Sequence, residues 1–68
     1  MIELVFLIED APVGGYVARA LGVSIVTESD NLPSLRESIR DAVRCHFDGP
    51  DVPSAMRLHF VRDEVIAA

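Results

Sequence analysis

The residues with chemical potential in this chain are two histidines, one cysteine and a row of arginines. Cys45 next to His46 suggests a thiol nucleophile with its base, but neighbouring helical residues point about 100° apart and do not face each other. His46 and His59 alone do not complete a zinc site, which takes three or four ligands. We therefore expect no metal, no cofactor and no enzyme activity. A small ligand-binding or hydrolytic protein that uses His46 and His59 is kept as an alternative.

The same side chains have structural interpretations. His46 ends an apolar stripe of the expected helix, so it is expected to be partly buried and bonded to backbone or to a strand. Free cysteine is among the most frequently buried residue types, and Cys45 is expected to be a buried or boundary thiol.

Arg36, Arg40 and Arg44 recur every four residues and form one stripe along a helix. Like charges at this spacing repel slightly, and Glu37 and Asp41, three residues before Arg40 and Arg44, can offset the repulsion. Two interpretations remain open. The stripe is a solvated charged face, or it contacts an anionic protein partner or an acidic surface on a second subunit.

Size and charge restrict the class of protein. The 68 residues make one domain, residues 1–68, with eleven acids, six bases and a net charge of −5. Nucleic-acid binders normally carry a basic surface, so direct nucleic-acid binding is not expected. The apolar run after Met1 is interrupted by Glu3 and is too short for a membrane span. One cysteine and no export signal favour the cytoplasm. Small domains bury a modest share of their surface, so self-association is expected to add stability.

Four segments have strand character, at residues 2–8, 16–21, 23–28 and 56–66, the last interrupted at Asp63-Glu64. In the first, alternation places Leu4 and Phe6 on a core face and Val5 and Leu7 on the opposite face. Proline and two glycines in residues 9–15 predict a hairpin connection, and Gly22 marks a reversal.

One amphipathic helix is predicted from about residue 32 to residue 46. Asn31 is a suitable N-cap and Pro33 is tolerated in the first turn. Asp48-Gly49-Pro50 is expected to end the helix, with Gly49 at the position that follows its last residue. The apolar stripe is built from Leu32, Leu35, Ile39, Ala42, Val43 and His46.

The predicted order β-β-β-α-β describes an α+β fold of two layers. Three strands form an antiparallel meander, the helix crosses over, and the last strand lies at an edge parallel to the first. The helix covers one face of the sheet. Val5, Leu7 and Val61 are expected in the middle of the uncovered face, and an exposed apolar patch usually marks an interface. We therefore expect a homo-oligomer formed there or along an edge strand.

The segment Gly14-Gly15-Tyr16-Val17-Ala18-Arg19-Ala20, the strand that ends Thr27-Glu28-Ser29-Asp30, and the helix residues 32–43 resemble the HicB-like antitoxin family. The family pattern is a GGYVA-like strand, a second strand with a polar turn, and a helix of the form L-x-x-L-x-x-x-I-x-x-A. The resemblance spans residues 1 to about 47, and the last strand agrees with the family's element order.

This resemblance implies a partial ribonuclease-H-like fold without catalytic residues. HicB-like antitoxins neutralise a small ribonuclease toxin, HicA, by covering its active site, and many carry a DNA-binding segment after this domain. The sequence shows no such segment after its last strand. The leading expectation is a non-enzymatic protein-binding module that occludes a HicA-like toxin. The alternative is a structural or regulatory homo-oligomer without a toxin partner.

Overall fold

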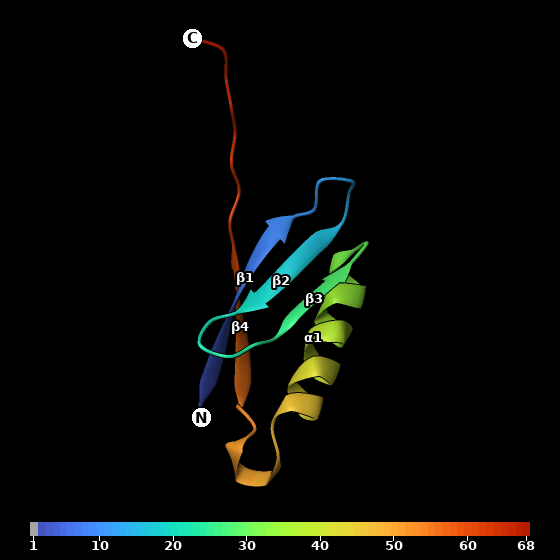
Figure 1. The fold of residues 1–68 in the computed structure, drawn as a ribbon, viewed down its shortest axis with the longest axis vertical. Helices are drawn as coiled ribbons and strands as arrows, with labels where there is room; N and C mark the ends of the chain where they lie inside the picture. Colours follow the sequence, from blue (N-terminus) through green and yellow to red (C-terminus); the bar gives the residue numbers. More distant parts are fainter. Residues whose placement is uncertain (1) are drawn as a thin grey trace.

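The computed structural model describes residues 2–68 and has the predicted order of strands and helix (Figure 1). It is an α+β fold of one sheet and one long helix. The elements are β1 (Glu3–Asp10), β2 (Tyr16–Ala20), β3 (Val26–Ser29), α1 (Leu32–His46), a 3-10 turn η1 (Gly49–Asp51) and β4 (Ala55–Phe60).

The four strands form a mixed sheet in the order β3-β2-β1-β4. β1 pairs antiparallel with β2, and β2 pairs antiparallel with β3, which is the predicted meander. β4 returns after the helix and pairs parallel with β1, from Glu3 opposite Ala55 to Ile8 opposite Phe60. The predicted crossover helix and parallel edge strand are therefore confirmed.

The core lies between one face of the sheet and α1. Alternation along β1 sends Leu4, Phe6 and Ile8 into it, and all three are almost completely buried. Every third or fourth residue of α1 meets them, which is the spacing of one helix face. The other members of this hydrophobic core are Ala18, Ile25, Leu35, Ile39 and Val43.

Helix α1 begins as predicted and ends differently. The side chain of Asn31 accepts a hydrogen bond from the backbone N–H of Ser34 at 2.9 Å. Phe47, in an extended conformation, follows the last turn, and Gly49 instead opens η1 with a φ of +54°. The prediction that Gly49 directly follows the helix is therefore wrong. In the described part of the chain, no helix has the length and apolarity needed to cross a membrane.

Two strand boundaries differ from the predictions near the first hairpins. β1 continues to Asp10, two residues further than expected. β3 starts at Val26, and Val23 and Ile25 belong to the preceding loop, where the N–H of Ile25 bonds the carbonyl of Val23 at 3.0 Å. This tight turn follows Gly22, whose φ of +88° reverses the chain as predicted. The turn places the side chain of Ile25 in the core. This burial accounts for the apolar, strand-like composition of residues 23–25, although they lie in a loop.

The last strand is shorter than predicted, because β4 ends at Phe60 rather than near Ile66. The N–H of Val61 still bonds the carbonyl of Ile8 at 2.8 Å, but no strand lies beside the residues that follow. Residues 62–68, called here the C-terminal arm, continue the direction of β4 and leave the body of the molecule (Figure 1).

Candidate functional site

One face of the sheet is not covered by any element of residues 2–68, because α1 packs on the other face. We call it the open face. The strand registers place Val5, Val17 and Val26 on it with their charged neighbours. Its full set within the paired strands is Glu3, Val5, Leu7, Glu9, Val17, Arg19, Val26, Glu28, Ala55, Arg57 and His59.

The middle of the open face is apolar. Val5 and Leu7 on the central strand are half-buried, as is Val17 on β2, whereas Val26 on the edge strand is 63% exposed. Arg19 and His59 lie on either side of Leu7 in the neighbouring strands. The structure therefore brings Val5 and Leu7 together as predicted. Val61, predicted with them, follows β4 at the end of the sheet and is 36% exposed.

Ion pairs flank this apolar centre. Arg57 donates two hydrogen bonds to the carboxylate of Glu3, from Nε to Oε1 at 2.6 Å and from Nη2 to Oε2 at 3.1 Å. These bonds lower the pKa of the Glu3 carboxyl below its usual value of 4.5 and raise the pKa of the Arg57 guanidinium, since each stabilises the charged form. Arg19 Nε lies 3.6 Å from Glu9 Oε1. Two arginines of the face are thus already neutralised by acids on the same face.

The arginine stripe lies on the exposed side of α1. Arg40 pairs with Glu37, and Arg44 pairs with Asp41 at 3.1 Å, so the predicted compensation by acids three residues earlier is confirmed. Arg36 makes no ion pair within residues 2–68. The stripe therefore offers one cation with no carboxylate partner in the described chain and two that are locally satisfied.

A groove separates α1 from β4, and it was not anticipated from the sequence. It holds about 240 Å³ and is lined by Arg36, Ile39, Arg40, Met56 and Leu58. It exists because α1 lies over β2 and β3 and leaves the edge strand partly uncovered. The floor of the groove is apolar and its helix side carries two guanidinium groups. We call it the α1–β4 groove.

His46, His59 and Cys45, the three side chains considered for chemistry, do not form a common site. His46 is exposed at the end of α1, where its ring meets Phe47 edge to face at 4.9 Å. His59 lies on the open face, on the other side of the sheet from α1. Cys45 is exposed. The expected burial of His46 and Cys45 is wrong, because the last helical turn presents Val43, and neither of these two residues, to the core.

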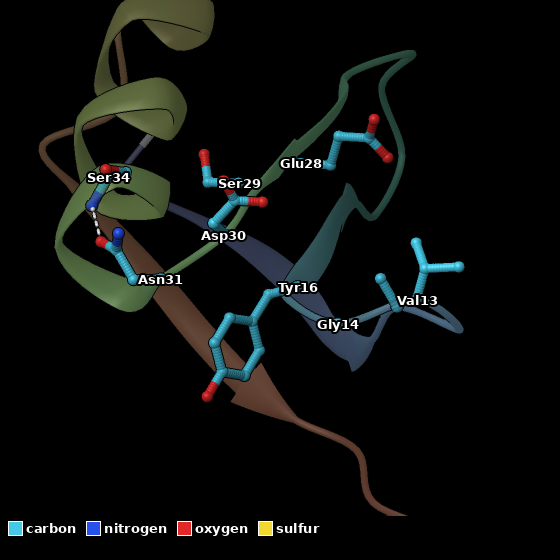
Figure 2. A pocket seen from close by; sticks show the side chains of 9 residues that line it. Val13, Gly14, Tyr16, Glu28, Ser29, Asp30, Asn31 and Ser34 are labelled. Atoms are coloured by element: carbon cyan, nitrogen blue, oxygen red, sulfur yellow. Dashed lines mark hydrogen bonds between the residues drawn. The ribbon is translucent and has the colours of Figure 1, made fainter.

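A second hollow lies where the first hairpin meets the start of α1 (Figure 2). It holds about 430 Å³, and Figure 2 shows Asn31 directed at Ser34 while Glu28 points away from the helix. Gly15 approaches the end of β3 so closely that an added Cβ would lie 2.6 Å from the carbonyl oxygen of Ser29. In the sequence, the pair Gly14-Gly15 had indicated only a hairpin connection at this place. Glu28 and Asp30 make the hollow acidic, so it does not suit an anion.

Within the described residues, no cluster of three His, Cys, Asp or Glu side chains has a geometry that could hold a metal ion. The surfaces with distinctive chemistry are thus the open face and the α1–β4 groove. Both are lined by apolar side chains and arginines, which suits contact with another macromolecule.

Comparison with known proteins adds a family. The chain is 40% identical to a UPF0150 protein of Thermotoga maritima over 65 residues, which cover 96% of this chain and 91% of that protein. It is 46% identical to a UPF0150 protein of Archaeoglobus fulgidus over 50 residues, 74% of each chain. No family model matches the sequence, and no solved structure matches it significantly. On these two relationships, the chain belongs to the UPF0150 family.

Proposed function

We propose that this chain is a non-enzymatic protein-binding module, and that its partner is a small basic protein of the HicA-like toxin type. The observation that carries the proposal is the open face, whose apolar centre at Val5 and Leu7 is left uncovered by the described chain. Exposed apolar surface of this kind usually marks an interaction site. The mechanism is steric: a partner that lies on the sheet has its own active site covered.

Charge supports the choice of partner. The chain carries a net charge of −5, and the two open-face arginines that pair with Glu3 and Glu9 add no free positive charge. A ribonuclease is basic where it meets RNA, so an acidic protein approaches that surface with favourable electrostatic steering. The proposal places the module in the cytoplasm, where such a toxin would meet RNA.

The proposal is tested by co-expressing the chain with a HicA-like toxin and measuring growth of the bacterial host. Wild-type chain is expected to protect the host. Leu7→Glu inserts a charge into the apolar centre, and a desolvated unpaired charge weakens binding by more than about tenfold, so protection is expected to be lost.

Val13→Glu is the matched control. It also adds one carboxylate, but Val13 is 99% exposed in the turn between β1 and β2 and does not belong to the open face. Val26→Glu provides a second open-face variant at a 63% exposed position, where the fold tolerates a charge. Circular dichroism confirms that each variant is folded. Protection by both open-face variants at the wild-type level would reject the open face as the binding surface, and absence of protection by wild type would reject the toxin partner.

A further inference from the structure

The C-terminal arm (residues 62–68) is exposed along its whole length and belongs to no strand of the sheet. The molecule measures 51 × 21 × 17 Å, and the arm extends along its long axis beyond the sheet and the helix (Figure 1). Val65 is 95% exposed and Ile66 is 79% exposed. No backbone hydrogen bond joins the arm to residues 2–61. An extended segment with two exposed β-branched residues is well suited to pair with another strand.

The free edge of β4 offers such a strand. The N–H groups of Ala55 and Val61 point toward β1, where they bond the carbonyls of Ile2 and Ile8. Along a strand, the backbone N–H and C=O groups of successive residues point alternately to its two sides. Those of Met56, Leu58 and Phe60 therefore point away from β1, outward from the sheet. Phe60 is 52% exposed. No strand within residues 2–68 pairs with this edge, because β4 is the last strand of the sheet.

We infer that two copies of this chain associate through β4 and the C-terminal arm. The β4 strands run antiparallel about a two-fold axis, and the arm of each copy adds a strand to the free edge of the other copy's β4. The interface is isologous, as a two-fold axis requires. It joins the two sheets into one, with both helices on the same side. The inference is independent of the proposed toxin partner, because it uses the edge of the sheet and not the open face.

Side-chain chemistry selects the register. Residues opposite each other in an antiparallel pair share a face, so an axis through Val61 places Val61 opposite its own copy. His59 then lies opposite Asp63 of the second copy on the open-face side. On the helix side, Met56 lies opposite Ile66 of the second copy and Leu58 lies opposite its Glu64.

Glu64 of the second copy then reaches the α1–β4 groove, because Leu58 lines that groove together with Arg36 and Arg40. Arg36 has no carboxylate partner within its own described chain, and this register supplies one. Ile66 of the second copy meets Met56, which is half-buried on the groove floor. Glu64 and Ile66 of the arm thus complement the groove, which offers arginine side chains from α1 and apolar side chains from β4.

The neighbouring registers are less favourable. Moving the axis to Arg62 places that arginine opposite its own copy, and like charges directly opposite are destabilising. Moving the axis to Phe60 places Arg62 of the second copy opposite Leu58, beside the guanidinium groups of Arg36 and Arg40. Of these three, only the axis through Val61 brings no arginine opposite another arginine or beside Arg36 and Arg40 in the groove, and it places Asp63 of the second copy opposite His59.

Sedimentation velocity of the full chain across micromolar concentrations tests the inference. Wild type is expected to sediment with twice the mass of one chain. Asp63→Lys removes the carboxylate that faces His59 at two symmetric contacts and puts an ammonium group in its place, so the dissociation constant is expected to rise about tenfold. His59→Glu combined with Asp63→Lys places opposite charges at the two contacts and is expected to recover most of that loss.

Because Asp63 lies outside the core, its substitution is expected to leave the fold intact, which circular dichroism checks. Glu28→Lys, the same change of charge on β3 at the opposite edge of the sheet, is the matched control and is expected to leave the dimer unchanged. A monomer at all concentrations would overturn the inference. It would also be overturned by a dimer that Asp63→Lys leaves intact, or by one that Leu7→Glu alone disrupts, since the latter would form through the open face.

Discussion

Replacing Asn31 by alanine removes the side chain that caps the start of α1, and its cost can be worked out from the geometry. The backbone N–H of Leu35 already bonds the carbonyl of Asn31 at 3.0 Å, and Pro33 has no N–H. Ser34 therefore depends on the Asn31 side chain for its 2.9 Å bond. No acidic residue in the first turn compensates for its loss. Asn31 is exposed, so alanine leaves no cavity and the cost is that of the cap alone.

The loss of such a cap typically costs about 1 kcal/mol. A domain of this length has a total stability of roughly 3–10 kcal/mol, so the thermal midpoint of Asn31→Ala is expected to fall by about 4–8 °C. Asn31→Asp keeps an acceptor in place and adds a negative charge at the positive end of the helix dipole, so its midpoint is expected to stay near that of wild type. Differential scanning calorimetry measures both. An unchanged midpoint in Asn31→Ala, or an equal fall in both variants, would refute this account of the cap.

Two further predictions concern the first hairpin and the edge of the sheet. Gly15→Ala is expected to destabilise more than Gly14→Ala in urea unfolding: both have positive φ, but only at Gly15 does the new Cβ approach the Ser29 carbonyl, at 2.6 Å. Equal midpoints would mean that this close approach relaxes without cost. Because Arg57 lowers the pKa of Glu3, the contact stabilises the fold above about pH 4.5 and is lost as pH falls through the folded pKa. The stability of Glu3→Gln is therefore expected to lie below that of wild type at pH 7 and to converge with it in acid, and parallel pH profiles from urea unfolding would contradict this.

The local parts of the fold could be predicted from the sequence because each follows from neighbouring residues. Asn31 and Pro33 indicated the start of α1, and the spacing of Leu35, Ile39 and Val43 indicated its buried side. Alternation in β1 predicted which residues face the core. The element order, the meander and the parallel edge strand followed from these elements and from the rules of strand connection.

The remaining features depend on how elements meet, and no local pattern encodes that. His46 and Cys45 are exposed because the last turn of α1 presents Val43 to the core. The α1–β4 groove exists because α1 lies nearer to β2 and β3 than to β4. β4 ends at Phe60, where its pairing with β1 stops opposite Ile8 although β1 runs on to Asp10, and the charged residues 62–64 follow at once.

Two surfaces were open as alternative interfaces from the sequence. We propose that the open face binds a different protein and that the free edge of β4 binds a second copy of the chain. Val61, predicted with Val5 and Leu7, belongs by position to the edge rather than to the centre of the open face. We propose that Arg36 and Arg40 likewise contact the second copy, through the α1–β4 groove, whereas Arg44 lies outside this groove and pairs with Asp41.

The central claim is that a protein partner covers the open face, and a methyl NMR titration tests it most directly. Adding the purified HicA-like toxin to the labelled chain should shift the methyl resonances of Val5, Leu7 and Val17, while that of the turn residue Val13 stays unchanged. Shifts confined to Met56 and Ile66, or no shifts at all, would contradict the claim.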